Sequence, residues 1–253
     1  MQEEPDSDVP GDPLNPEDYE NAKHVQEEPY EVEDQEQNQH MFEGDIDNID
    51  PSVGKNAIRG SWRRWENGNI PYVIASSFSS RDRSIIAKAM EAYHKETCIK
   101  FVPRSSERGY VYIAAGQGCS SSVGRTGSRQ QVSLGNGCVY TGIVIHELMH
   151  ATGFWHEQSR ADRDSHISIN WSNIKAGMEF NFLKYDLNKI DHLGAQYDTC
   201  SVMHYGSTAF AKVNDVFSLR TFLQSNSVLG KEDDSPEARH QVHDRTERRI
   251  LRH

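Results

Sequence analysis

The sequence predicts an α+β fold in which a twisted mixed sheet and two long helices form the amino-terminal half of the domain and the carboxyl-terminal half is irregular. Three observations lead to this class. Short β-prone runs recur between residues 70 and 134, two stretches with helical spacing interrupt and follow them, and regular periodicity fades after residue 153. This order of strand, helix, further strands and helix is typical of a mixed domain.

Local patterns define each element. The β-prone runs are residues 70–74, 99–102, 110–113 and 131–134. The run from Ser80 to Arg83 introduces the first helix behind a Ser N-cap, and apolar residues at 85, 86, 89, 90 and 93 follow at helical spacing. The second helix runs from Thr141 to about Thr152 and ends at Gly153.

Charge divides the chain into two parts. It carries 27 Lys and Arg against 38 Asp and Glu, a net charge of −11, and the first 50 residues hold 18 of the acids but one base, Lys23. The rest is mildly basic, without the concentrated Lys and Arg that phosphate contacts require. No apolar run approaches the ~18 residues that span a bilayer. The sequence therefore predicts no nucleic-acid partner and no membrane span.

Residues 1–41 form an acidic leader rich in Glu, Asp, Pro and Gln. Because it holds few branched aliphatic side chains, it cannot bury enough apolar surface to offset the entropy of ordering, and we expect it to be largely disordered. No basic-then-apolar stretch opens the chain, so a secretory signal is not visible. An intracellular protein and a chain that lacks its first segment both fit this observation.

Five residues of the second helix and the turn after it have the spacing of a catalytic metal site. His146 and His150 are four apart, so both imidazoles leave one face of the helix. Glu147 is placed to hold water at the metal and take its proton, and Gly153 permits a sharp turn that returns His156 as a third nitrogen ligand. Three protein ligands with an open position indicate a catalytic zinc site with one Zn²⁺ per chain.

The run HELMHATGFWHEQSRADRD at residues 146–164 resembles the astacin family of zinc endopeptidases, in particular its hatching-enzyme-like members, within the metzincin clan. The run SVMHYG at residues 201–206 resembles the Met-turn of that family, and the similarity covers about residues 42–212. The resemblance implies a zincin-like catalytic domain at residues 56–212 that hydrolyses peptide bonds in protein or peptide substrates.

The resemblance also implies roles for individual residues. Glu147 would act as general base and then as general acid, and Tyr205 would be a displaceable zinc ligand whose hydroxyl stabilises the oxyanion. Met203 would form an apolar floor beneath the three imidazoles. Glu157 would anchor the new amino terminus that activation creates.

The FEGD run at residues 42–45 resembles the prosegment motif of the same family, in which the aspartate, here Asp45, takes the water position at zinc. Residues 42–55 would then be the end of an inhibitory prosegment, and the chain would be a zymogen. An activating protease would cut after a basic residue, with Lys55 as the first choice and Arg59 or Arg64 as alternatives.

Four cysteines, Cys98, Cys119, Cys138 and Cys200, allow three full pairings, and the sequence alone does not choose among them. The family pattern implies a bond between Cys119 and Cys138. It pairs Cys98 with a cysteine close to the carboxyl terminus that this chain lacks, so a Cys98–Cys200 bond stays open. Residues 213–253 depart from the family, and we expect a poorly ordered tail there.

The resulting hypothesis is a secreted zinc endopeptidase precursor whose substrate strand pairs with the edge formed by residues 131–134. One alternative is a different metzincin. Another is a catalytically incompetent or misfolded product of an altered transcript, because the closing segment and terminal cysteine of the family are missing. A pure interaction protein fits less well, since binding alone does not require Glu147.

Overall fold

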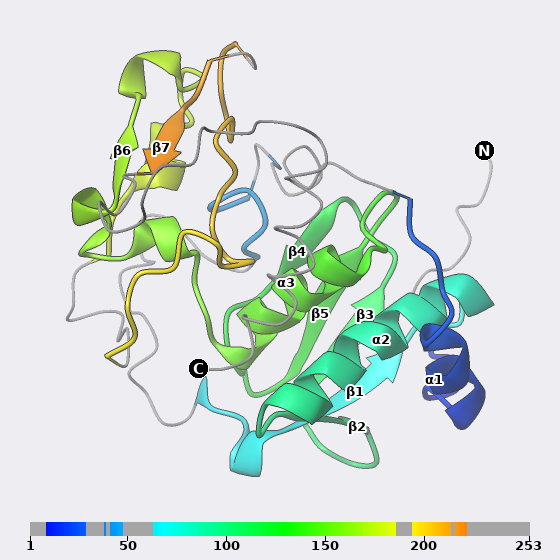
Figure 1. Ribbon diagram of the computed structural model, residues 1–253. Coiled ribbons are helices and arrows are strands. Elements are labelled where there is room, and N and C mark those ends of the chain that lie inside the picture. The colour runs from blue at the N-terminus through cyan, green and yellow to red at the C-terminus, as the bar shows by residue number, and fades with distance from the viewer. Residues whose placement is uncertain are drawn as a thin grey trace, which may run out of the picture.

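The computed structural model describes residues 9–28, 38, 41–47, 63–185, 194–213 and 216–221. Its centre is a five-stranded sheet in the order β2-β1-β3-β5-β4 (Figure 1). The strands are β1 (Asn69–Ile74), β2 (Lys100–Pro103), β3 (Tyr110–Ala114), β4 (Cys119–Ser121) and β5 (Arg129–Leu134). The pairs β1–β2, β1–β3 and β3–β5 are parallel, whereas β4 runs antiparallel to β5. The predicted mixed sheet is therefore confirmed, with β4 as a strand that the β-prone runs did not indicate.

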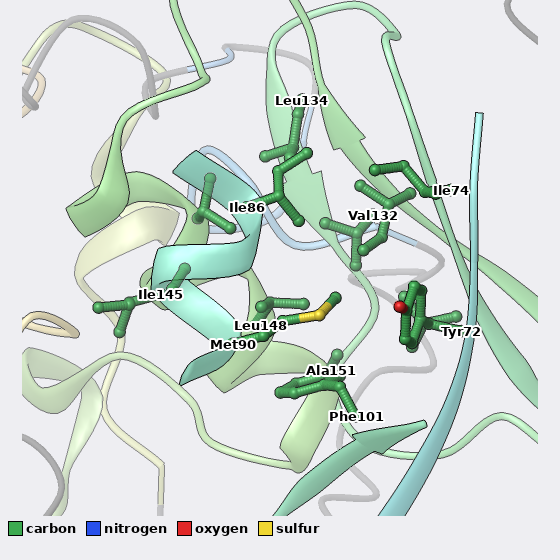
Figure 2. Packing of buried hydrophobic residues seen from close by; sticks show 14 of the residues in the cluster. Tyr72, Ile74, Ile86, Met90, Phe101, Val132, Leu134, Ile145, Leu148 and Ala151 are labelled. Carbon is green, nitrogen blue, oxygen red and sulfur yellow. The ribbon is translucent and has the colours of Figure 1, made fainter. Parts of the chain in front are cut away.

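Two long helices, α2 (Ser80–Glu96) and α3 (Thr141–Thr152), pack beside each other against this sheet (Figure 1). The N-cap of α2 is Ser79, whose side chain forms a capping box with Asp82. Figure 2 shows side chains of both helices, including Met90 and Leu148, interlocked with Val132 of the sheet. This apolar cluster fixes the position of α3. Among the described residues, no helix is long and apolar enough to cross a bilayer.

The second half of the chain is irregular, as predicted. It contains short 3-10 turns, namely η4 (Glu157–Ser159), η5 (Arg163–Ser165), η6 (Trp171–Asn173) and η7 (Glu179–Phe182), while η3 (Glu66–Gly68) precedes β1. A second sheet pairs β6 (Ile167–Ile169) with β7 (Leu219–Thr221) in antiparallel register. The expectation of a poorly ordered tail is wrong at β7, because Leu219 is 2% exposed in a small cluster with Ile167. Residues 222–253 lie outside the described residues.

The leader also differs from the expectation of disorder, over residues 9–28. Helix α1 (Pro16–Ala22) begins at the N-cap Asn15 and lies against α2 (Figure 1). Leu14 and Ala22 are buried at 8% and 3% exposure, so even this acidic segment contributes apolar area to the core. The composition of the segment predicted disorder because it does not reveal that the residues packing against the segment come from α2, far along the chain.

Candidate metal centre

The middle of α3 is buried although it carries three polar side chains. His146, Glu147 and His150 are 2%, 0% and 0% exposed. The helix ends at Gly153, whose φ of 124° lies in a region that side chains disfavour and glycine tolerates. The chain then turns back and buries His156 to 1% exposure beside the helix.

The three imidazoles converge through their Nε2 atoms. Nε2 of His146 lies 3.1 Å from Nε2 of His150 and 3.2 Å from Nε2 of His156. A tetrahedral ion with metal–nitrogen bonds of about 2.0–2.1 Å holds its ligand atoms about 3.3 Å apart. The spacing of the nitrogens therefore matches a tetrahedral metal site.

Backbone carbonyls fix the tautomer of two of these rings. Nδ1 of His146 lies 2.8 Å from the carbonyl oxygen of Val202, and Nδ1 of His150 lies 2.8 Å from that of Phe154. A carbonyl can only accept, so each Nδ1 carries the hydrogen and each Nε2 offers a lone pair. Lone pairs about 3 Å apart repel one another unless a cation lies between them, so this donor set fits a metal ion.

Asp45, from the segment at residues 42–47 that follows the leader, completes the group. Its Oδ2 lies 2.9 Å from Nε2 of His146 and 3.1 Å from Nε2 of His156, and its Oδ1 lies 3.5 Å from Nε2 of His150. The four ligand atoms all lie within 4.8 Å of one another, and all four residues are buried. Three imidazole nitrogens and one carboxylate oxygen are ligands that zinc accepts in tetrahedral sites.

The electrostatics of the centre favour a cation. Burial raises the pKa of the Asp45 carboxyl, but His156 and His150 outweigh burial and leave that pKa well below its usual range. Burial likewise lowers the pKa of His156, but Asp45 and Glu43 reverse the effect and raise it to about 10. The pKa of His150 is lowered, chiefly by burial. The carboxylates thus create a negative potential at the point where the imidazoles meet.

Glu43 is a residue of the centre that the sequence reasoning missed. It occupies a turn with φ of 50°, followed by Gly44 at 85°. Its carboxylate accepts hydrogen bonds from Nδ1 of His156 at 2.7 Å, Ser159 Oγ at 2.7 Å and the Tyr185 hydroxyl at 2.9 Å. These contacts hold the strained turn in place. The one available signal was its position two residues before Asp45.

Tyr205 lies beside this turn. Its hydroxyl donates to the backbone carbonyl of Glu43 at 2.7 Å, and its ring centroid is 4.8 Å from that of His156. Met203 is 4% exposed and belongs to the core cluster that includes Leu148 of α3. The structure therefore places Tyr205 against the ring of His156 and Met203 in the apolar core with α3, while the catalytic role of Tyr205 and the floor role of Met203 stay predictions.

Glu157 follows the third imidazole and is paired within the domain. Its Oε1 accepts hydrogen bonds from Arg160 at 3.1 Å and from the backbone N–H of Asp198 at 2.8 Å. Burial raises the pKa of its carboxyl. The expected activation site at Lys55 and its alternative Arg59 lie outside the described residues, so the anchoring of a new amino terminus stays a prediction.

The cysteines follow the family-based expectation in part. Cys119 and Cys138 form a disulfide with a Cα–Cα distance of 5.5 Å, which ties β4 to the loop that enters α3. Cys98 and Cys200 are exposed and not bonded to each other. The open Cys98–Cys200 pairing is therefore not formed.

The predicted substrate edge is wrong. Residues 131–134 belong to β5, which is covered on one side by β3 and on the other by β4. The outer edge is β4, where the N–H of Ser121 donates to Asp45 at 3.0 Å and its carbonyl accepts from Asp47 at 2.9 Å. Asp45 and Asp47 therefore occupy backbone groups of this outer strand beside the metal centre.

Comparison with known proteins gives consistent matches. The model of the peptidase family described as Astacin matches residues 57–240, which extends past residue 212. Zinc metalloproteinase nas-13 of Caenorhabditis elegans is 56% identical over 161 residues, 63% of this chain and 36% of that protein. Meprin A subunit beta of Mus musculus is 41% identical over 195 residues, 77% of this chain and 27% of that protein.

A solved structure is also similar. High choriolytic enzyme 1, a hatching enzyme zinc-protease from Oryzias latipes, is 36% identical, with a TM-score of 0.59 over 76% of this chain and 94% of that chain. The chain spans 36% to 54% of the length of the first three curated relatives it matches.

Proposed function

The chain belongs to the astacin peptidase family, a family of zinc metalloendopeptidases, and we propose that it is the latent precursor of such an enzyme, acting on extracellular proteins. One observation carries the proposal. The Nε2 atoms of His146, His150 and His156 converge with the spacing of ligands around a tetrahedral metal, and Asp45 of the expected prosegment lies on the fourth side. Catalysis at such a site needs one labile position, and Asp45 would keep that position blocked in the precursor.

The chain's residues would share the work of peptide hydrolysis. Zinc bound by the three histidines would supply Lewis acidity at the scissile carbonyl. Glu147, adjacent to a ligand on α3, would take the proton of the attacking water and return it to the leaving amine. Tyr205, once released from the Glu43 carbonyl, would donate its hydroxyl hydrogen to the developing oxyanion.

Substrate backbone would take the place of residues 45–47 on β4. The N–H and carbonyl of Ser121 pair with residues 45–47, and a substrate in extended form could use the same groups. Main-chain pairing of this kind gives affinity with little demand on side-chain sequence. Removal of residues 42–47 would therefore free the metal centre and the binding edge together.

An extracellular address has two supports. The Cys119–Cys138 disulfide is typical of proteins that fold in oxidising compartments. Asn170-Trp171-Ser172 is a glycosylation acceptor sequence, and Trp171 in it is 48% exposed. Both features favour a chain that passes through an oxidising secretory compartment.

Casein digestion tests the proposal. The zinc-loaded full chain would be assayed before and after limited trypsin treatment, beside Glu147→Ala treated in the same way and beside a chelator control. We expect digestion to persist after trypsin is inhibited, and to be lost in Glu147→Ala and with chelator.

The alternative of an incompetent product makes a different prediction. A wild-type chain that melts cooperatively with bound zinc yet digests nothing after trypsin would overturn the enzymatic proposal. A chain that aggregates without a cooperative transition would instead support the altered product with an incomplete carboxyl-terminal segment.

A further inference from the structure

Residues 9–28 of the leader, here called the docking arm, are held by basic residues of α2. Arg83 donates from Nε and Nη2 to the two carboxylate oxygens of Asp18 at 3.1 and 2.7 Å, and the two side chains are 15% and 8% exposed. The same guanidinium donates to the backbone carbonyls of Asp12 and Pro13 at 2.9 and 2.8 Å. A bidentate pair shielded from water fixes the arm in one register.

The arm ends at the amino terminus of α3, the helix that carries the metal-binding histidines. The carboxylate of Glu27 accepts hydrogen bonds from the backbone N–H of Thr141 at 2.6 Å and from its hydroxyl at 2.5 Å. Lys88 of α2 donates to the same carboxylate at 3.0 Å. One side chain of the leader therefore joins the two long helices of the domain.

α3 provides no cap of its own. The residue at its N-cap, Tyr140, makes no side-chain hydrogen bond to the first turn. The first N–H groups of a helix have no partner inside the helix and lie at the positive end of its dipole. A carboxylate at this end is the favoured partner, and Glu27 supplies it from 114 residues away.

The protonation of Glu27 agrees with this geometry. Burial raises the pKa of its carboxyl, but hydrogen bonds from Thr141 and the ammonium of Lys88 outweigh burial and lower that pKa. The charged form is therefore the one that the folded chain stabilises.

We infer that Glu27 is a positioning residue for the metal-binding helix, and that the docking arm completes the amino end of α3. Docking and capping involve other contacts than the proposed block by Asp45, since Glu27 bonds to Thr141 in the first turn of α3 whereas Asp45 lies against the imidazoles of His146 and His156. The leader is thus part of the folded domain, and its excision would uncap α3.

Residue-level hydrogen exchange on the full chain tests this role. Glu27→Ala removes the cap, Glu27→Gln keeps one acceptor oxygen without the charge, and Glu28→Ala removes a charge from the exposed neighbour. We expect Glu27→Ala to speed exchange of the amides of residues 141–144 about fivefold, Glu27→Gln to fall between it and wild type, and Glu28→Ala to have no effect.

Two outcomes would overturn the inference. One is equal exchange of residues 141–144 in Glu27→Ala and Glu28→Ala, since the cap would then contribute nothing. The other is faster exchange spread equally over α1, α2 and α3 in both Glu27 variants, because Glu27 would then hold the whole domain together without acting on the end of α3. A change confined to the first turn of α3, partly rescued by Gln, supports the cap.

Discussion

Glu43 accepts a hydrogen bond from Nδ1 of His156 at 2.7 Å, while Asp45 approaches Nε2 of the same ring at 3.1 Å. The segment at residues 42–47 therefore contacts both nitrogens of one imidazole of the metal centre. The first contact orients the ring as an outer partner of a metal ligand, and the second occupies the side on which substrate would bind. Latency in this chain would rest on both carboxylates.

Replacing Asp45 with Ala should release activity without proteolysis. The variant loses the oxygen that lies 2.9 Å from Nε2 of His146 and leaves the fourth direction of the site open to water. We expect casein digestion by the uncut, zinc-loaded chain to rise on the order of tenfold or more over wild type. Glu17→Ala, an exposed charge change in α1, is the control and should stay latent. If uncut Asp45→Ala digested casein no faster than uncut wild type, the proposal that Asp45 blocks the metal site would be contradicted.

Replacing Glu43 with Gln should weaken the attachment of residues 42–47 to the metal centre and destabilise the fold. The carboxylate takes three hydrogen bonds in a site that is 1% exposed, and Gln can accept at only one oxygen. We expect a loss of about 1–3 kcal/mol in the free energy of unfolding, measured with urea, and a partial gain of casein digestion without cutting. If Glu43→Gln lowers the free energy of unfolding but leaves casein digestion by the uncut chain unchanged, Glu43 stabilises the fold without contributing to latency.

The metal ligands could be predicted from sequence because their geometry is local. His146 and His150 share one face of a helix by their spacing alone, and Gly153 marks the turn that returns His156. No distant partner is needed to infer this arrangement. α2 and most strands of the sheet could be predicted for the same reason, because their patterns lie within short stretches of sequence.

The missed features depend on distant partners. α1 lies in an acidic segment. Its Asp18 pairs with Arg83, which is 65 residues away in the sequence, and such pairs cannot be inferred from composition. β4 is three residues long and polar, and it becomes a strand only through its pairing with β5. Its presence moved the free edge of the sheet away from residues 131–134. Glu43 was missed because its hydrogen-bond donors, Ser159 and Tyr185, lie more than 100 residues away in the sequence.

The contribution of Glu27 to stability should depend on pH. Its pKa in the folded chain lies below the ordinary value of 4.5, so the charged carboxylate stabilises the fold above that pH. The stabilisation is lost as the pH falls from 4.5 through the lowered pKa, because the folded state then has to bind a proton that the unfolded state already holds. We expect the difference in urea midpoint between wild type and Glu27→Gln to be largest near pH 7 and to shrink below pH 4.5. A difference that stays constant from pH 7 to pH 3 would contradict the charged cap.

Removing zinc should destabilise the whole domain, because the centre joins α3, the turn around His156 and the segment that carries Asp45. Zinc that binds the folded chain alone adds about 4 kcal/mol when its free concentration is a thousand times the dissociation constant. In a Glu147→Ala background, which avoids self-digestion, we expect a chelator to lower the melting temperature and added zinc to restore it. His150→Ala in the same background removes one of the converging nitrogens, so its melting temperature should respond far less to either treatment. Equal responses in the two chains would show that the stabilising ion lies elsewhere.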